Sequence, residues 1–375
     1  HVPQRALYGA ELHFSSSRID VLAGCRFSHF LQYGLRAQER EPAEFDSRFY
    51  GTFVHDVLEH VVQQTEREGG FAAVPRSRVQ ELAQKRMEQN AQTLLETFPD
   101  SGRTGYLLRR TFDEVTQVVD ELYDELSVSA FRPKFCELEF SARGALPGVA
   151  FAGERCRGVV EGFVDRVDVW QSGGRPYVRV VDYKTGKKSF DYTNVLHGRG
   201  LQMLLYLFAL VRQGGHLLHG EPLPAGVLYF PARIERVSVR DRLAQAEIEK
   251  ERRKQLRRSG VLLNSDPVLE AMEPCGGSPR FLPYALDKEG RKTGDLASFV
   301  QLAQLERFVF RTVAALGDEL ADGRIDPDPC IRDAKDSACA FCPYSEICAG
   351  HEQPRWLKKI TAEEFWQTLE RREHG

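Results

Sequence analysis

Two sets of side chains in this sequence of 375 residues have the types and spacing that metal chemistry requires. Cysteines form the first set. Cys25 stands alone near the start, and Cys339, Cys342 and Cys348 follow near the end as C-x2-C-x5-C. Four thiolates can hold a soft metal centre that ties the two ends of the chain together. This one-plus-three split favours a [4Fe–4S] cluster over zinc, which usually takes two paired knuckles, and over unbound thiols.

The second set offers hard oxygen ligands and one cation. Asp165 is followed, seventeen residues later, by the tripeptide Asp182-Tyr183-Lys184. Mg²⁺ prefers carboxylate and water oxygens, and two aspartates on neighbouring strands can hold it beside a phosphodiester. Lys184 would then position the nucleophile or offset charge on the phosphate. The alternative is a surface salt-bridge pair before a tight turn at Thr185-Gly186, because Asp-x-Lys alone is a weak signal.

Residues 159–170 and 178–184 alternate as β-strands and place these charges on faces that are otherwise apolar. Gly173-Gly174 between them predicts a hairpin-like turn that brings the two strands side by side. An unpaired buried carboxylate is costly, so such positions normally carry a metal or a partner. The residues predicted to share a face are Val159, Phe163, Asp165, Val167 and Val169 on the first strand, and Val178, Val180, Asp182 and Lys184 on the second.

The composition is that of an ordinary globular protein, with 42% hydrophobic residues, 28% charged residues and a formal net charge of -3. Near-neutral charge means that a nucleic-acid partner would be held by local patches. No apolar run is long enough to cross a bilayer, and no signal-peptide pattern opens the chain, so we expect a cytoplasmic protein without disulfides. The first residue is His1 rather than Met, which fits a segment of a longer polypeptide.

The order of the patterns predicts an α/β fold in which helices flank a central mixed sheet. Serines 15–17 are good N-caps, so Cys25 is expected at the end of a short helix, and a second helix is expected after Gly51. We expect one domain, residues 1–375, in four parts. They are a mainly helical part (1–130), an α/β core (131–240), a helical insertion with a return helix (241–325), and the cysteine cluster with its tail (326–375).

The motif series resembles that of the PD-(D/E)xK nuclease superfamily, in its RecB-like branch. The matching segments are GFVDRVD (162–168), VVDYKTG (180–186) and LQMLLY (201–206), with GTFVH (51–55) upstream. Together with the one-plus-three cysteines they resemble the C-terminal nuclease domains of the AddB family, subunits of bacterial AddAB helicase–nucleases. The stretch GVLLNSDPVLEAME (260–273) is also similar to a part of those chains. The resemblance covers nearly the whole sequence and implies a restriction-endonuclease-like core.

The resemblance also implies roles for single residues. His55, Asp165 and Asp182 would bind Mg²⁺ or Mn²⁺, with a backbone carbonyl near Tyr183 completing the set. Lys184 would be the catalytic lysine. The alternative for His55 is a core or surface histidine that binds no metal and whose ring nitrogens are hydrogen-bonded.

Gln202 and Tyr206 lie four residues apart and therefore share a helix face. The resemblance implies that this face is turned to the active site, where the pair contacts DNA or orients the lysine. For Tyr206, an interior position satisfied by the backbone is an equal alternative.

The resemblance also bears on three glutamates near the predicted metal site and on the cysteines. The family often carries a glutamate on the strand before the GxxD motif, where Glu137 fits best and Glu139 competes. Glu161 is unexpected next to that motif and lies either in or just outside the metal site. By resemblance, Cys25, Cys339, Cys342 and Cys348 would hold a [4Fe–4S] cluster.

The predicted function is Mg²⁺-dependent hydrolysis of DNA phosphodiesters. The resemblance implies an exonuclease that acts on strands unwound by an AddA-like helicase–nuclease partner, in the processing of double-strand breaks for recombination. No motor motif occurs in the sequence, so unwinding would belong to that partner or to the rest of a longer chain. Two alternatives stay open. One is a stand-alone Cas4-like Fe–S exonuclease, and the other is an inactive DNA-end-binding module with a structural cluster.

Overall fold

A mixed β-sheet forms the centre of the computed structural model, which describes residues 7–37, 47–97, 102–186, 189–234, 245–348, 350 and 353–374. The strand order is β1-β4-β5-β6-β7-β10, and β2 and β3 also pair with β4. β4 and β5 are antiparallel, β5 and β6 are parallel, and β6 and β7 are antiparallel. The strands are β1 (Leu12–Ser15), β2 (Arg132–Phe140), β3 (Val149–Ala152), β4 (Arg157–Ser172), β5 (Arg175–Lys184), β6 (Leu223–Pro231), β7 (Ser259–Leu263) and β10 (Leu296–Ala297).

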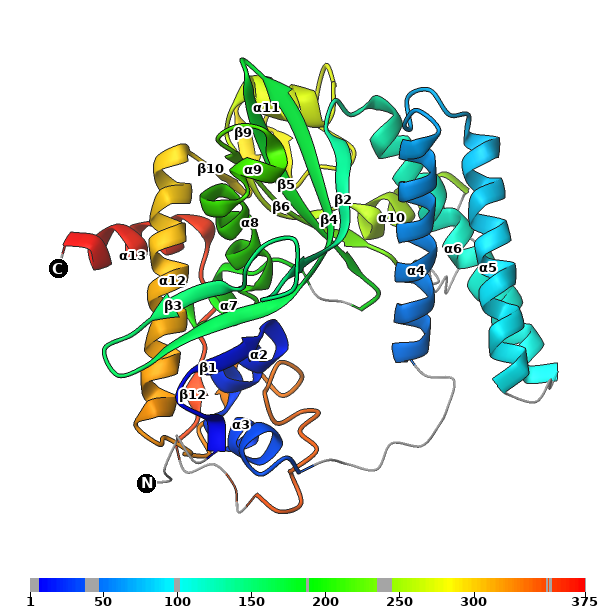
Figure 1. Cartoon of the computed structure of the whole chain (residues 1–375). Helices are drawn as coiled ribbons and strands as arrows, with labels where there is room; N and C mark the ends of the chain where they lie inside the picture. The colour runs from blue at the N-terminus through cyan, green and yellow to red at the C-terminus, as the bar shows by residue number, and fades with distance from the viewer. Residues whose placement is uncertain are drawn as a thin grey trace.

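Helices cover both faces of this sheet (Figure 1). On one side α4 (Ser47–Arg67) packs against β2 and β4, and α5 (Arg76–Thr97) and α6 (Gly102–Val128) pack beside it. On the other side α8 (Gln202–Gln213) lies on β5 and β6 and is covered by α12 (Phe299–Ala321). The predicted α/β architecture with a central mixed sheet is therefore confirmed.

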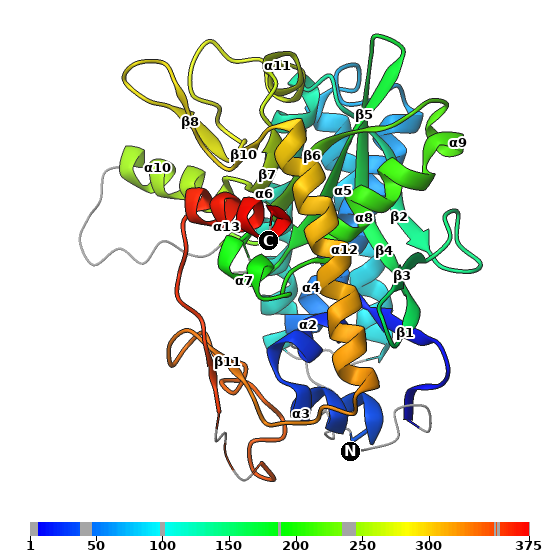
Figure 2. The same ribbon diagram turned by 90° about the vertical axis from the view of Figure 1, so that its left-hand side faces the viewer.

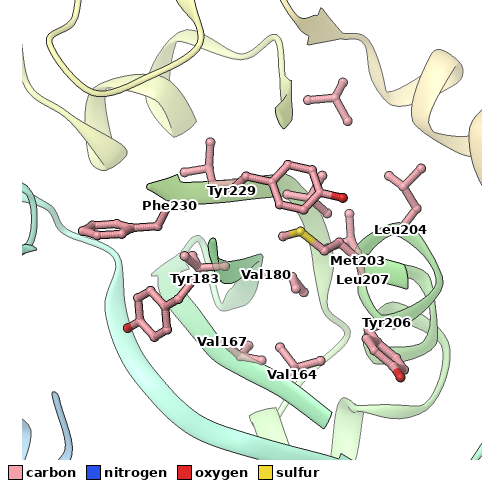
Figure 3. Close-up of a cluster of buried hydrophobic side chains, with 14 of the residues drawn as sticks. Val164, Val167, Val180, Tyr183, Met203, Leu204, Tyr206, Leu207, Tyr229 and Phe230 are labelled. Atoms are coloured by element: carbon pink, nitrogen blue, oxygen red, sulfur yellow. The ribbon is translucent and has the colours of Figure 1, made fainter. Parts of the chain in front are cut away.

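The core between α8 and the sheet is apolar and fully buried. Figure 3 shows Met203 and Leu207 of α8 on the side of the helix towards Val167 and Val180 of the central strands. All four side chains are buried. The continuous apolar run of α8 is explained by this position, since a helix between a sheet and a second helix is buried on most of its surface.

The opposite face of the sheet carries a buried network of charges. Arg166 and Arg179 donate to the two carboxylate oxygens of Asp168, each over 2.8 Å. Glu125 of α6 accepts from Arg179 over 3.1 Å and from Arg258 over 2.9 Å. All five residues are buried, so each charge depends on the others for its partners.

Some expected element boundaries differ from those observed. The helix expected after Gly51 begins earlier, at Ser47, within α4. Residues 241–325, expected to be helical, also add β7 and β10 to the edge of the sheet, because their short apolar runs pair with β6 and with each other. Gly173-Gly174 does form the turn between antiparallel β4 and β5, with Ser172 opposite Arg175. No described helix has the length and hydropathy needed to cross a membrane.

The remaining elements surround this core. Helices α2 and α3 and the cysteine-rich segment lie side by side at one end of the molecule in both views (Figures 1 and 2). The short elements are α2 (Ser16–Gly24), α3 (Arg26–His29), a π-helix (Phe30–Gly34), α7 (Tyr192–Leu196), α9 (Gly215–Leu218), α10 (Gln245–Leu256), α11 (Asp266–Met272), β8 (Tyr284–Leu286), β9 (Lys292–Gly294), β11 (Cys330–Ile331), β12 (Arg355–Trp356) and α13 (Ala362–His374).

Candidate active site

Three carboxylates stand on three neighbouring strands. Glu137 of β2 and Asp165 of β4 both lie between the register pairs Cys136–Arg166 and Leu138–Val164 of these strands. Asp165 and Asp182 directly adjoin the paired residues Arg166 and Val181 of β4 and β5. Hydrogen bonding between the strands therefore sets the spacing of the three acids before any side-chain contact is made.

An imidazole from α4 completes the group. The Nε2 atom of His55 lies 2.9 Å from the carbonyl oxygen of Tyr183, and its Nδ1 atom lies 3.6 Å from Asp165 Oδ2. The same carboxylate oxygen accepts from the Tyr183 backbone N–H over 2.6 Å. Ligand atoms of His55, Glu137 and Asp165 all lie within 4.8 Å of one another. The structure thus brings together residues from one helix and three strands.

Asp182 and Lys184 form a close pair beside this group. Lys184 Nζ lies 2.5 Å from Asp182 Oδ2, and Asp182 is only 6% exposed. The same ammonium stands over the ring of Tyr229 on β6, 5.5 Å from its centroid. Tyr229 gives Lys184 a favourable cation–π surface and restricts where its ammonium can go. The predicted sharing of one face by Asp182 and Lys184 agrees with this contact.

Burial and mutual repulsion perturb the acids. Burial raises the pKa of Asp165 well above its usual range, and the charge of Asp182 raises it further. Burial also raises the pKa of Glu137, with Glu59 and Asp182 adding to the effect. Burial lowers the pKa of His55, which favours the neutral imidazole that a metal binds.

A divalent cation would relieve this repulsion. The donor set, one neutral imidazole with several carboxylate oxygens and a nearby carbonyl oxygen, suits Mg²⁺ or Mn²⁺. Crowding of like charges in a buried place is costly without such an ion. The residues present therefore fit a hard divalent metal.

The backbone at this point departs from regular strand geometry. Glu137 has a φ of 49°, a conformation that non-glycine residues rarely adopt. Phe163, predicted to share the face of Asp165, is 50% exposed, whereas Val164 is buried. That part of the strand prediction was wrong, because simple alternation does not hold next to the unpaired positions Glu137 and Asp165. Backbone strain of this kind is often found at functional sites.

The structure separates the two competing glutamates of β2. Glu137 joins His55 and Asp165, whereas Glu139 accepts a hydrogen bond from the Ser141 hydroxyl over 2.7 Å. Glu161 lies outside this group, and its carboxylate is 3.5 Å from the imidazole of His13 on β1.

Tyr206 is directed at the backbone beside the site. Its hydroxyl donates to the carbonyl oxygen of Glu161 over 3.3 Å, and its ring stacks on Phe140 with centroids 4.9 Å apart. A Cβ atom at Gly162 would lie 2.1 Å from that hydroxyl. These contacts favour the interior alternative, and the catalytic role of Tyr206 stays a prediction. Gln202, one turn earlier, is half-buried at the start of α8.

The four predicted cluster cysteines line one small cavity. Cys25, Cys339, Cys342 and Cys348 surround a volume of about 220 Å³, together with apolar residues. Cys25 caps the C-terminal end of α2, as its position after the serine N-caps predicts. Burial raises the pKa of Cys25 and also that of Cys339, for which the neighbouring Cys342 and Cys348 add to the effect. Bound iron would supply the positive charge that such thiolates need, so the residues fit a thiolate-held centre.

Ion pairs hold this cavity together from outside. Arg26 donates to Asp328 over 2.8 Å and, through its Nε, to Glu319 of α12 over 3.0 Å. Arg355 donates to the carbonyl oxygens of Ala23 and Asp328, over 2.7 and 2.9 Å. We call Arg26, Glu319, Asp328 and Arg355 the ionic clamp. It joins the start and the end of the described chain next to the cysteines.

Comparison with known proteins agrees with the fold. The family model of the PD-(D/E)XK nuclease superfamily matches residues 13–349. The chain belongs to this superfamily. The matched range includes β4 and β5, with Asp165 and Asp182 on these adjacent strands and Lys184 two residues after the second aspartate.

Curated relatives are named as one of the subunits of an ATP-dependent helicase/deoxyribonuclease. The relative from Moorella thermoacetica is 34% identical, over 92% of this chain and 30% of its own length. The relative from Thermoanaerobacter sp. (strain X514) is 29% identical, over 98% of this chain and 33% of its own length. The chain therefore spans about a third of the length of these relatives, and the predicted likeness to the AddB family is confirmed.

Sequence reasoning overlooked two residues of this PD-(D/E)XK site. Tyr229, beneath Lys184, falls on a strand that the sequence predicts only as one more apolar run. Glu59, whose charge raises the pKa of Glu137, stands four residues after His55 on α4. Its spacing from His55 is a usable signal, because residues i and i+4 share a helix face.

Proposed function

We propose that the chain is a metal-dependent DNA nuclease whose active site is the group of His55, Glu137, Asp165, Asp182 and Lys184. The observation that carries the proposal is the convergence of half-buried Glu137, Asp165 and His55 at one place in the sheet, next to buried Asp182 and its lysine partner. Membership of the PD-(D/E)XK superfamily supports it.

His55, Asp165 and Asp182 would hold Mg²⁺ or Mn²⁺, with the Tyr183 carbonyl oxygen, and Glu137 is a further ligand from β2. When bound, this ion supplies a Lewis acid for a phosphoryl oxygen and lowers the pKa of a water molecule. The sheet fixes the acids, and α4 fixes the imidazole, so no large rearrangement is needed to bring the ligands together.

Lys184 would act on the phosphate itself. Its ammonium can stabilise the negative charge that grows on the phosphoryl oxygens during hydrolysis. Asp182 and the ring of Tyr229 hold that ammonium in place before substrate arrives. Gln202 and Tyr206 keep the role that the family resemblance implies, orientation of the lysine or contact with DNA. Tyr206 would exert it through the backbone at Glu161.

The four cysteines would hold a [4Fe–4S] cluster. They line one cavity although one stands near the start of the chain and three near its end. This one-plus-three split supports a cluster over zinc, whose structural sites usually take two paired knuckles.

The substrate and the partner follow from the named relatives. We propose that the chain works with an AddA-like helicase–nuclease partner and cuts DNA strands during double-strand break processing, as one nuclease domain spanning residues 1–375. The relatives' names, which describe one component of a larger enzyme, favour this over a stand-alone Cas4-like exonuclease.

Asp182→Ala tests the proposal. A metal site contributes several kcal/mol to the transition state, so we expect cleavage of labelled DNA with Mg²⁺ to fall roughly a thousandfold, with DNA binding nearly intact. Asp113→Ala, an exposed aspartate on α6, is the matched control and should cut normally. Equal cleavage by wild type and Asp182→Ala would refute the assignment, and no cleavage by the wild type with Mg²⁺ would favour an inactive DNA-end-binding module.

A further inference from the structure

Two cavities of the molecule meet next to Lys184. The larger, about 400 Å³, extends from Cys25 and Cys342 to Ser189 and Tyr229. The other, about 290 Å³, contains Ser189, Tyr229 and Lys184. Both are lined by Ser189 and Tyr229, so the two cavities adjoin at these residues, and we call the two together the groove. The groove extends from the cysteine segment to Lys184 of the candidate active site.

An aromatic side chain stands in solvent at the cysteine end of the groove. Phe341 lies between Cys339 and Cys342, lines the larger cavity, and is 94% exposed. It is the most exposed large apolar side chain among the residues that the structure describes. Phe190, half-buried, lines the same cavity. Exposed aromatic rings along a groove provide faces on which unpaired bases stack.

Charges along the groove suit a phosphate backbone. Arg199 lines the larger cavity, and Arg233, exposed, lines the smaller one. Two acids also line the larger cavity, but each is engaged by the protein. Asp191 accepts from the guanidinium of Arg332 over 3.0 Å, and Asp20 accepts from a backbone N–H over 2.7 Å. The pair with Arg332 offsets the charge of Asp191, so this acid competes less with a phosphate for the cations of the groove.

We propose that this groove guides a single strand of nucleic acid past Lys184, and that Phe341 stacks on one of its bases. The proposal rests on the proposed nuclease function and names the path of its substrate. A single strand fits better than a duplex, since a duplex hides its base faces and offers nothing for Phe341 to stack on. Phe341 lies between Cys339 and Cys342 in the sequence, so a centre bound by these cysteines would also fix the position of Phe341 in the groove.

Binding of fluorescently labelled oligothymidylate to the full 375-residue chain tests this, by anisotropy with Ca²⁺ in place of Mg²⁺. Phe341→Ala should bind the oligonucleotide roughly tenfold more weakly than the wild type, because one base–aromatic stack is lost. Phe341→Trp should restore the affinity, because it restores the stack. The control is Trp356→Ala on β12, because Trp356 is also an exposed aromatic, 69% exposed, but does not line the groove. Its affinity should equal that of the wild type.

Several outcomes would overturn the proposal. One is an affinity of Phe341→Ala for oligothymidylate equal to that of the wild type, and another is no binding by the wild type. A third is an equal loss of affinity in Phe341→Ala and Trp356→Ala. The fourth is that Phe341→Ala loses as much affinity for blunt duplex DNA as for the single strand. Unchanged affinity would assign Phe341 to contact with another protein. Binding is measured here without cleavage, so the result is independent of the Asp182→Ala test and a failure of either claim can be told from a failure of the other.

Discussion

Glu137, Asp165 and Asp182 stand on strands that are hydrogen-bonded side by side, whereas the four cysteines stand at a helix end and in turns from opposite ends of the sequence. Sheet register places the acids, and the ionic clamp holds the segments that carry the thiols. The first region is a rigid scaffold that presents ligands. In the second region, a centre bound by the four cysteines would itself link two segments that are far apart in the sequence. The two should therefore respond differently when ligands or supports are removed.

The cysteine site should have the larger effect on stability. Cys342→Ala should abolish the brown colour and the iron and sulfide content of anaerobically purified protein. It should also lower the free energy of unfolding by up to about 5 kcal/mol, the size of a crosslink closing a loop of a hundred residues or more. Cys275→Ala, outside the cysteine cavity, should do neither. Zinc without iron in the wild type would contradict the cluster assignment.

Support of the catalytic sheet can be removed at Glu125. Burial alone would raise its pKa, but the charges of Arg258, Arg179 and Arg166 lower it to about 2. Breaking such a network leaves buried charges unpaired, so Glu125→Gln should lose about 3–5 kcal/mol of unfolding free energy at neutral pH.

The lowered pKa also sets a pH window. The contribution of Glu125 is fully present above its ordinary pKa of 4.5 and is lost as the pH falls toward 2. Denaturant titrations across this window should show a steeper acid loss for wild type than for Glu125→Gln. Glu121→Gln, whose partner Arg280 lies at the surface, should change stability by less than about 1 kcal/mol. Parallel acid profiles for wild type and Glu125→Gln would contradict the role of the network.

The two glutamates of β2 offer a matched pair of variants at the acid site. Glu137→Gln should weaken Mn²⁺ binding and slow cleavage by roughly 10–100-fold, because it removes a charge from the metal group. Glu139→Gln should leave both unchanged, since Glu139 is bound to Ser141 instead. Titration of Mn²⁺ by magnetic resonance, with cleavage rates alongside, measures both effects. The reverse order of effects would exchange the two assignments.

The smallest effect is expected at the ionic clamp. Arg26→Ala should let a chelator remove iron roughly tenfold faster, because residues that support metal ligands tune affinity by about that much. Arg324→Ala is the control, since Arg324 pairs with the same Glu319 over 3.5 Å from an exposed position. Unaltered iron loss in Arg26→Ala would show that the cysteines alone hold the two segments.

Local patterns were sufficient to predict some of this arrangement. Strand periodicity and the Gly173-Gly174 turn predicted that β4 and β5 pair, and serine capping predicted that Cys25 ends a helix. Both depend on interactions between residues near in sequence.

Other features depend on contacts between distant residues. The sequence favoured Glu137 but left Glu139 as a competitor, because both lie on the same side of an ideal strand. The distinction arises from the positive φ of Glu137 and the nearby imidazole of α4. Packing of Tyr229 beneath Lys184 likewise requires the parallel pairing of β5 with β6.

The contact of Tyr206 with Gly162 links two motifs that look independent along the chain. Any side chain at position 162 would collide with the tyrosine hydroxyl, and the φ of 155° there is itself suited to glycine. The glycine of GFVD and the tyrosine of LQMLLY are thus in direct contact, and each restricts what the other position can hold. In a lineage that replaces the glycine, the tyrosine should be exchanged for a shorter residue, so the two positions should be inherited together.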